Sequence, residues 1–199
     1  MHTYCTTGYL LTMSEPRLNF LTLVIGKPGT GKTTITLEIA KALQNETGRK
    51  IIIFDTDYHP SYTAVKDISF TKLKTWKGSI GKVVHGDVDA FCRRVMKYQR
   101  DAFIIFEDAS KYIEPNLTNA VKRFVINYRK GNFDVAFMFH YLGDVPPRLC
   151  KMYNQVLLFK TEDDLSVKQP KFSNWHNISR IAQRVKQHPG FNYCEAIEM

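Results

Sequence analysis

Five short apolar runs stand out along the chain, separated by longer segments whose apolar residues recur at helical spacing. The runs are rich in Ile, Val, Leu and Phe and lack the polar alternation of a half-exposed strand. Buried strands that alternate with helices are typical of a parallel sheet covered on both faces. We therefore predict an α/β fold, with a doubly wound, mostly parallel sheet of about five strands and helices on both faces. The strands are expected at 20–25, 50–54, 102–106, 134–139 and 155–159.

The segments between these runs predict helices. Gly48 and Gly131 are placed to end two of them, and Pro115 is placed to begin one, because proline is tolerated in a first helical turn. A basic helix near the C-terminus carries Arg180 and Arg184. The predicted ranges are 35–43, 88–100, 115–130, 145–153 and 174–187.

The 199 residues are enough for one domain with a full core and too few for two ordinary ones. Residues 1–17 are expected to form an N-terminal lead-in, within which Met13 is an alternative start. Residues 18–165 form the predicted core, and residues 166–199 a basic helical extension of the same domain.

The segment 58–87 has no clear period, because Pro60 and three glycines interrupt it. Lysines interleave there with aromatic residues, which suits nucleic acid through base stacking and phosphate contacts. The same mixture suits a half-buried hairpin whose lysines extend into solvent, and we favour that interpretation. The residues concerned are Lys66, Lys72, Lys74, Lys77 and Lys82, with Tyr58, Tyr62, Phe70 and Trp76.

A glycine-rich stretch directly after the first strand matches the phosphate-binding pattern G-x-x-x-x-G-K-[ST] without a gap. Its glycines allow a tight turn whose N–H groups face phosphate oxygens, and the following helix adds the positive end of its dipole. Lys32 is expected to reach the β- and γ-phosphates, and Thr33 to ligate Mg²⁺. The pattern predicts a P-loop NTPase that binds ATP and Mg²⁺. The predicted nucleotide-binding residues are Gly26, Lys27, Pro28, Gly29, Thr30, Gly31, Lys32, Thr33 and Thr34.

Acidic and polar residues follow three of the other predicted strands, at the carboxyl edge where parallel sheets bind ligands. Glu107 and Asp108 end the third strand, and Asp55-Thr56-Asp57 ends the second. We assign Glu107 to the Mg²⁺ shell together with Thr33, and Asp108 as the catalytic base. His140 ends the fourth strand, where a polar residue can sense the γ-phosphate; the alternative is a hydrogen-bonded core histidine.

The chain resembles the FtsK–HerA group of DNA-pumping ATPases, particularly the small genome-packaging ATPases of viruses and phages. The resemblance covers residues 18–165. It rests on the P-loop, Glu107-Asp108-Ala109, Arg129-Lys130-Gly131, His140, the turn Pro146-Pro147-Arg148-Leu149 and the segment 156–163. The chain departs from the group in carrying His140 where glutamine is usual, and in the inverted order of its acid pair.

The resemblance implies a homo-oligomeric ring, with a hexamer favoured, that moves double-stranded DNA and contacts a capsid or portal protein. It also implies an arginine finger supplied by a neighbouring subunit. Arg129 is the first candidate for this catalytic role, ahead of Arg123 and Arg148. Alternatively, Arg129 caps the carbonyl groups at the end of its own helix.

Other classes stay open. A phage assembly ATPase of the zonula-occludens-toxin type would act on proteins, but that type carries a transmembrane helix, and no apolar run here approaches about 18 residues. A small-molecule kinase or nucleotide-dependent switch would need an arginine-rich lid, and the segment after Gly143 offers little besides Arg148. Pro28 after Lys27 argues against partition ATPases of the ParA type, which open with K-G-G.

Lys and Arg number 28 against 19 Asp and Glu, and the net charge of +9 would attract polyanions such as DNA. If the charge is evenly spread, it describes only an ordinary basic protein. The four cysteines lie far apart, which argues against a zinc ribbon or disulfide framework and fits a reducing compartment. We expect no membrane insertion and a location in the cytoplasm of a prokaryotic or phage-infected cell, with virion association as an alternative.

Overall fold

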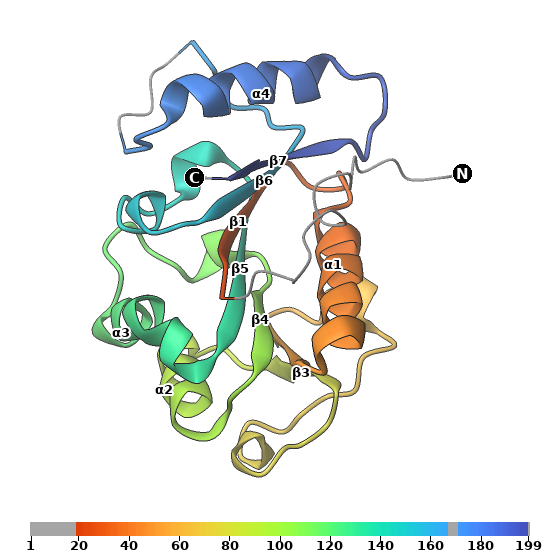
Figure 1. The fold of residues 1–199 in the computed structure, drawn as a ribbon, viewed down its shortest axis with the longest axis vertical. Helices are drawn as coiled ribbons and strands as arrows, with labels where there is room; N and C mark the ends of the chain where they lie inside the picture. The colour runs from red at the N-terminus through yellow and green to blue at the C-terminus, as the bar shows by residue number, and fades with distance from the viewer. Residues whose placement is uncertain (1–18, 167–170, 199) are drawn as a thin grey trace.

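The computed structural model describes residues 19–166 and 171–198, so the predicted lead-in, Met13 and Cys5 lie outside the described residues. Its centre is a seven-stranded sheet with the strand order β3-β2-β4-β5-β1-β6-β7 (Figure 1). All neighbouring strands pair in parallel except β6 and β7, which are antiparallel. The strands are β1 Leu21–Ile25, β2 Lys50–Asp55, β3 Ile80–Val84, β4 Ala102–Phe106, β5 Phe133–Phe139, β6 Gln155–Phe159 and β7 Cys194–Glu198.

The predicted fold class is confirmed, but the predicted number of strands is too low because β3 and β7 carry weak signals. In β3, position 81 requires glycine because the Ile68 side chain packs there, and a Cβ atom would stand only 2.5 Å from it. The next residue, Lys82, is buried and pairs with Asp67 at 3.4 Å. The hairpin expected in 58–87 is therefore wrong, since β3 pairs in parallel with β2.

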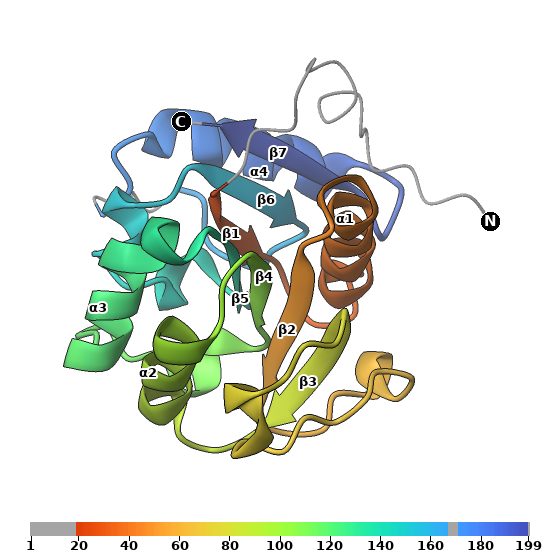
Figure 2. The same ribbon diagram turned by 60° about the horizontal axis from the view of Figure 1, so that its bottom comes forward.

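Helices cover both faces of the sheet (Figure 2). On one face, apolar side chains of α2 (Val88–Tyr98), α3 (Asn119–Asn127) and α4 (Trp175–Gln187) pack on a shared core. On the other face, α1 (Lys32–Thr47) and the segment around Tyr62 pack on a second, smaller cluster. Among the residues that the structure describes, no helix has the length and apolar character needed to cross a membrane.

Two predicted helices differ from the observed ones. Helix α3 begins at Asn119 and not at Pro115, because the Thr118 hydroxyl caps it by accepting a hydrogen bond from the backbone N–H of Val121 (3.3 Å). The short helix expected within 145–153, opening on Pro146-Pro147, is observed as a single 3₁₀ turn at Leu149–Lys151. The basic C-terminal helix is observed as α4, and the strand that follows it extends the sheet beside β6.

Candidate phosphate-binding and hydrolysis site

The glycine-rich loop 26–31 joins the end of β1 to the start of α1, at the edge of the sheet where the parallel strands end. Gly29 and Gly31 adopt φ angles of 80° and 88°, a left-handed conformation that favours glycine. A Cβ atom on Gly26 would lie 2.5 Å from the Cβ of Phe159 on the neighbouring strand. Backbone hydrogen bonds tie the loop to the ends of β5 and β6, from Gly26 N–H to Phe139 O (3.2 Å) and from Lys27 N–H to Lys160 O (2.8 Å). The loop is thus held in place before any ligand arrives.

Lys32 folds back under this loop. Its Nζ atom donates hydrogen bonds to the backbone carbonyls of Gly26 and Lys27, and only 6% of the residue is exposed. Burial lowers the pKa of Lys32 to about 8, although the charges of Glu107 and Asp108 oppose the shift. Helix α1 starts here without a side-chain cap and without an acidic residue in its first turn, so its N-terminal N–H groups suit an anion.

Glu107 lies between two hydroxyl groups. Its Oε1 atom accepts a hydrogen bond from Thr33 Oγ1 (3.1 Å), and its Oε2 atom accepts one from the Tyr62 hydroxyl (2.5 Å). Burial raises the pKa of Glu107, and the hydrogen bonds from Tyr62 and Thr33 oppose the rise. A carboxylate beside a threonine hydroxyl at a phosphate loop fits Mg²⁺, which is commonly held by one or two such groups together with phosphate oxygens. The structure thus brings Thr33 and Glu107 together as the sequence predicts.

His140 lies between Lys32 and Asp108. Its Nε2 atom is 2.9 Å from Asp108 Oδ1, and its Nδ1 atom is 3.5 Å from Lys32 Nζ. These contacts fit an imidazole that donates through Nε2 and accepts through Nδ1. Because β5 is the direct neighbour of β1, His140 stands beside the phosphate loop, and its side chain is 27% exposed. Four of the predicted catalytic residues, Lys32, Glu107, Asp108 and His140, therefore lie in one cluster.

The sequence analysis assigns no role in the site to two further residues, Tyr62 and Lys111. Tyr62 contacts Glu107, while Lys111 pairs with Asp108 at 2.7 Å and also with Asp57. The acidic residues at the end of β2 were the only sequence signal that this region belongs to the site. The buried Asp55 carboxylate accepts hydrogen bonds from the N–H groups of Asp57 (3.0 Å) and His59 (2.8 Å). That turn directs the chain toward Tyr62.

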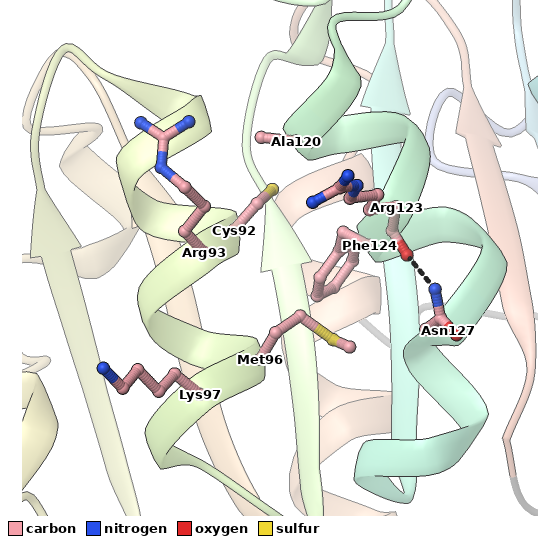
Figure 3. A pocket seen from close by; sticks show the side chains of 8 residues that line it. All are labelled: Cys92, Arg93, Met96, Lys97, Ala120, Arg123, Phe124 and Asn127. Carbon is pink, nitrogen blue, oxygen red and sulfur yellow. Dashed lines mark hydrogen bonds between the residues drawn. The ribbon is translucent and has the colours of Figure 1, made fainter.

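Arg129 lies at the opposite end of the parallel strands, in the turn that precedes β5. Its Nε atom donates to the Tyr128 hydroxyl (3.1 Å), and that hydroxyl donates to the Asn19 carbonyl (3.1 Å), which precedes β1. The phosphate loop follows the other end of β1, so Arg129 does not join the cluster in its own chain. Arg123 lines a groove between α2 and α3, with Phe124 and Met96 at its floor (Figure 3). None of the residues lining that groove belongs to the predicted phosphate site.

The basic segment 58–87 presents lysines but few aromatic faces. Lys66, Lys72, Lys74 and Lys77 are exposed, whereas Lys82 is buried. Tyr62 is fully buried, and Phe70 and Trp76 pack against the core. Tyr58, which is 64% exposed, is the one aromatic residue of this group with a largely open ring. Phosphate contacts are thus available along the segment, while the base-stacking part of the nucleic-acid interpretation is restricted to Tyr58.

Comparison with known families agrees with this geometry. The sequence profile of the CobQ/CobB/MinD/ParA nucleotide binding domain matches residues 21–187. Comparison with curated protein sequences finds no significant match. The sequence analysis argues against partition ATPases of the ParA type because Pro28 follows Lys27. The profile match corrects this argument, since the matched family includes ParA.

Solved structures resemble the chain in fold. The genome-packaging NTPase B204 of Sulfolobus turreted icosahedral virus 2, in complex with ATP-gammaS, has a TM-score of 0.69 and 14% identity, over 90% of this chain and 92% of that one. The DNA-packaging ATPase B204 of Sulfolobus turreted icosahedral virus has a TM-score of 0.60 and 14% identity, over 86% and 88%. A KaiC-like protein of Pyrococcus horikoshii has a TM-score of 0.50 and 14% identity, over 78% and 77%. At these identities the likeness shows the fold.

Proposed function

Because the chain belongs to the CobQ/CobB/MinD/ParA family of nucleotide-binding domains, we propose that it is a Mg²⁺-dependent ATPase. The observation that carries the proposal is the pairing of Thr33 with Glu107 (3.1 Å) directly beside Lys32. The loop and the N-terminus of α1 bind the triphosphate, and Lys32 contacts its β- and γ-phosphates. Thr33 and Glu107 hold Mg²⁺, which neutralises charge on these phosphates when bound.

Asp108 and His140 supply the remaining chemistry of hydrolysis. Asp108 orients the attacking water and accepts its proton; it follows Glu107 directly after β4, and its carboxylate is held by His140 (2.9 Å) and Lys111 (2.7 Å). His140 contacts both Asp108 and Lys32, so it links the base to the residue that holds the γ-phosphate. Binding of a γ-phosphate at Lys32 therefore changes the surroundings of the base through a single side chain.

We further propose that hydrolysis drives double-stranded DNA through a homo-oligomeric ring, with a hexamer favoured, in a virus- or phage-type genome-packaging motor. The fold likeness to packaging NTPases and the net charge of +9 support this. Arg129 is exposed and remote from its own phosphate loop, which suits a finger that completes the site of a neighbouring subunit. A capsid or portal protein would be the docking partner, and the infected cell or the virion the location.

The test is the ATPase rate with and without double-stranded DNA, together with the solution mass in the presence of nucleotide. We expect stimulation by DNA, a ring-sized assembly, and DNA affinity that falls steeply with salt. Reversing the charge of Lys72, Lys74 and Lys77 to glutamate should weaken DNA binding and flatten its salt dependence. A matched control reverses three scattered exposed lysines, Lys41, Lys151 and Lys186, and thus has the same net charge. Equal losses in both triple variants would remove Lys72, Lys74 and Lys77 from the DNA interface, and no stimulation of the unmodified protein by DNA would contradict a DNA-driven motor.

A second candidate is a nucleotide-dependent switch, which the family match favours because the profile describes nucleotide binding alone. A switch would bind and slowly hydrolyse ATP without stimulation by DNA. The same rate measurement therefore separates the two functions.

A further inference from the structure

The loop 188–193 joins α4 to β7 and lies beside the phosphate loop (Figure 1). A Cβ atom on Gly29 would stand 3.8 Å from Cε1 of Phe191, and one on Gly31 would stand 3.4 Å from Oδ1 of Asn192. Strand β7 starts at Cys194, opposite Phe159 at the end of β6, so this loop reaches the same edge of the sheet as the phosphate loop. Two segments about 160 residues apart in sequence therefore lie so close that one added carbon atom on either glycine would touch the other segment.

The loop is held in shape by its own contacts. The rings of His188 and Tyr193 stack with their centroids 3.7 Å apart, and Gly190 N–H donates to His188 Nδ1 (3.0 Å). The Tyr193 hydroxyl donates to Glu195 (3.2 Å), which also pairs with Arg184 of α4. Phe191 lies between the two stacked residues in sequence, yet it is 53% exposed. A large aromatic ring is thus presented to solvent by a structured loop, next to a phosphate site.

The position of the hydrolytic residues fixes the direction in which a bound nucleotide runs. Glu107 and His140 follow β4 and β5, on one side of β1, and the terminal phosphate must face them. Strands β6 and β7 lie on the other side of β1. The nucleoside is attached to the opposite end of the triphosphate, so it extends away from Glu107 and toward the loop that precedes β7.

We propose that Phe191 forms the nucleobase subsite, with its exposed ring stacked on the base of a nucleoside triphosphate; this rests on the proposed nucleotide binding at the phosphate loop. Stacking uses the π-face that every base offers, so the subsite accepts ATP and GTP alike. The phosphate loop then contributes affinity for the triphosphate, and Phe191 contributes affinity for the base. These two contributions are separable by experiment.

The test compares the dissociation constants of ATP, GTP and inorganic tripolyphosphate by titration calorimetry. Phe191→Ala should weaken ATP and GTP by about tenfold or more and leave tripolyphosphate within about twofold. Ile126→Ala is the matched control, because Ile126 is also an exposed apolar residue (48%) but lies on α3 and contributes nothing to this loop. It should change none of the three constants.

Phe191→Trp provides a second readout. It keeps a stacking surface, so ATP affinity should be retained, and ATP should quench more fluorescence than in the unmodified protein, whereas tripolyphosphate should not. Equal weakening of ATP and tripolyphosphate in Phe191→Ala, or no weakening of either, would overturn the subsite. A failure of the unmodified protein to bind tripolyphosphate would instead overturn the proposed function.

Discussion

The hydroxyl of Tyr62 lies 2.5 Å from Oε2 of Glu107, on the side of the carboxylate opposite Thr33. Tyr62 is fully buried, and it comes from the segment that connects β2 to β3. A buried carboxylate needs hydrogen bonds to stay ionised, and Tyr62 and Thr33 supply one to each oxygen of Glu107. Tyr62 is thus a positioning residue for the proposed metal ligand.

Tyr62→Phe should therefore affect metal binding at Glu107. Burial already raises the pKa of Glu107 and the tyrosine hydrogen bond lowers it, so removal of the hydroxyl should raise this pKa further. Because Mg²⁺ requires the ionised carboxylate, the Mg²⁺ concentration needed for half-maximal ATPase activity should rise by roughly ten- to a hundredfold, the cost of one lost hydrogen bond to a charged group. The acid limb of the pH–rate profile should also move to higher pH.

Tyr112→Phe is the control for this prediction. The Tyr112 hydroxyl donates to the backbone carbonyl of Glu107 (2.9 Å) and not to its carboxylate. This variant should lose about 1 kcal/mol of stability, as for an ordinary hydrogen bond, and keep the Mg²⁺ dependence of the unmodified protein. If both tyrosine variants shift the Mg²⁺ dependence equally, Tyr62 has no specific action on the carboxylate.

The depressed pKa of Lys32 predicts a pH dependence of phosphate binding. Burial lowers this pKa from 10.5 to about 8, so the ammonium loses its proton in the folded protein as the pH rises through 8. A charged lysine is needed to attract phosphate, whereas a rise in pH only adds negative charge to tripolyphosphate. Its affinity should therefore fall by up to about tenfold per pH unit above pH 8.

The same shift predicts the opposite trend for stability without ligand. Between pH 8 and 10.5 the unfolded chain binds a proton at Lys32 that the folded protein has released, so this residue makes the protein more stable as the pH rises across that window. Lys32→Met should remove both trends, as followed by calorimetry and by urea unfolding. A Lys32→Met protein with the pH dependence of the unmodified one would show that another group is responsible.

His140 should act on the rate of hydrolysis more than on nucleotide binding. It contacts Asp108 at 2.9 Å and Lys32 at 3.5 Å, and both contacts concern the γ-phosphate end of the site. We expect His140→Ala to lower kcat by about a hundredfold and to change KM by less than about threefold. His176→Ala, at an exposed histidine of α4, should leave both unchanged. A variant of His140 that raises KM with kcat intact would assign this residue to binding alone.

Arg129 provides a test of composite sites. Arg129→Ala should lower ATPase activity by about a thousandfold if the arginine acts in a neighbouring subunit. Mixing it with Asp108→Ala protein should partly restore activity, because some interfaces then combine an intact Arg129 with an intact Asp108. Lys130→Ala is the control for the loss of an adjacent exposed charge. Absence of recovery in the mixture would indicate that Arg129 only stabilises the turn around Tyr128, before β5.

Much of the fold can be predicted from the sequence because buried parallel strands are continuous apolar runs. The runs that became β2 and β4 are such cases, and the residues that follow them, together with the phosphate loop, form the site. Strand β3 was missed because Gly81 and Lys82 interrupt its apolar pattern, and each is explained only by a distant partner. Strand β7 was missed because it is a short edge strand with only two buried residues, Cys194 and Ile197, and these belong to different core clusters.

The same limit applies to the site. The roles assigned to Thr33 and Glu107 follow from local motifs, and the structure brings the two residues together. Tyr62 and Phe191 carry no motif, since their importance depends on where loops between distant strands come to lie. A tyrosine within an irregular lysine-rich segment is indistinguishable in sequence from a surface aromatic residue, and only its contact with Glu107 reveals the difference.

The most direct test of the account is the rate of phosphate release from ATP in the presence of Mg²⁺, compared between the unmodified protein and Lys32→Ala. Lys41→Ala, on an exposed position of the same helix, controls for the lost charge. We predict hydrolysis by the unmodified and Lys41→Ala proteins and a rate at least about a hundredfold lower in Lys32→Ala. Hydrolysis by Lys32→Ala at the rate of the unmodified protein, or none by the unmodified protein, would contradict the account.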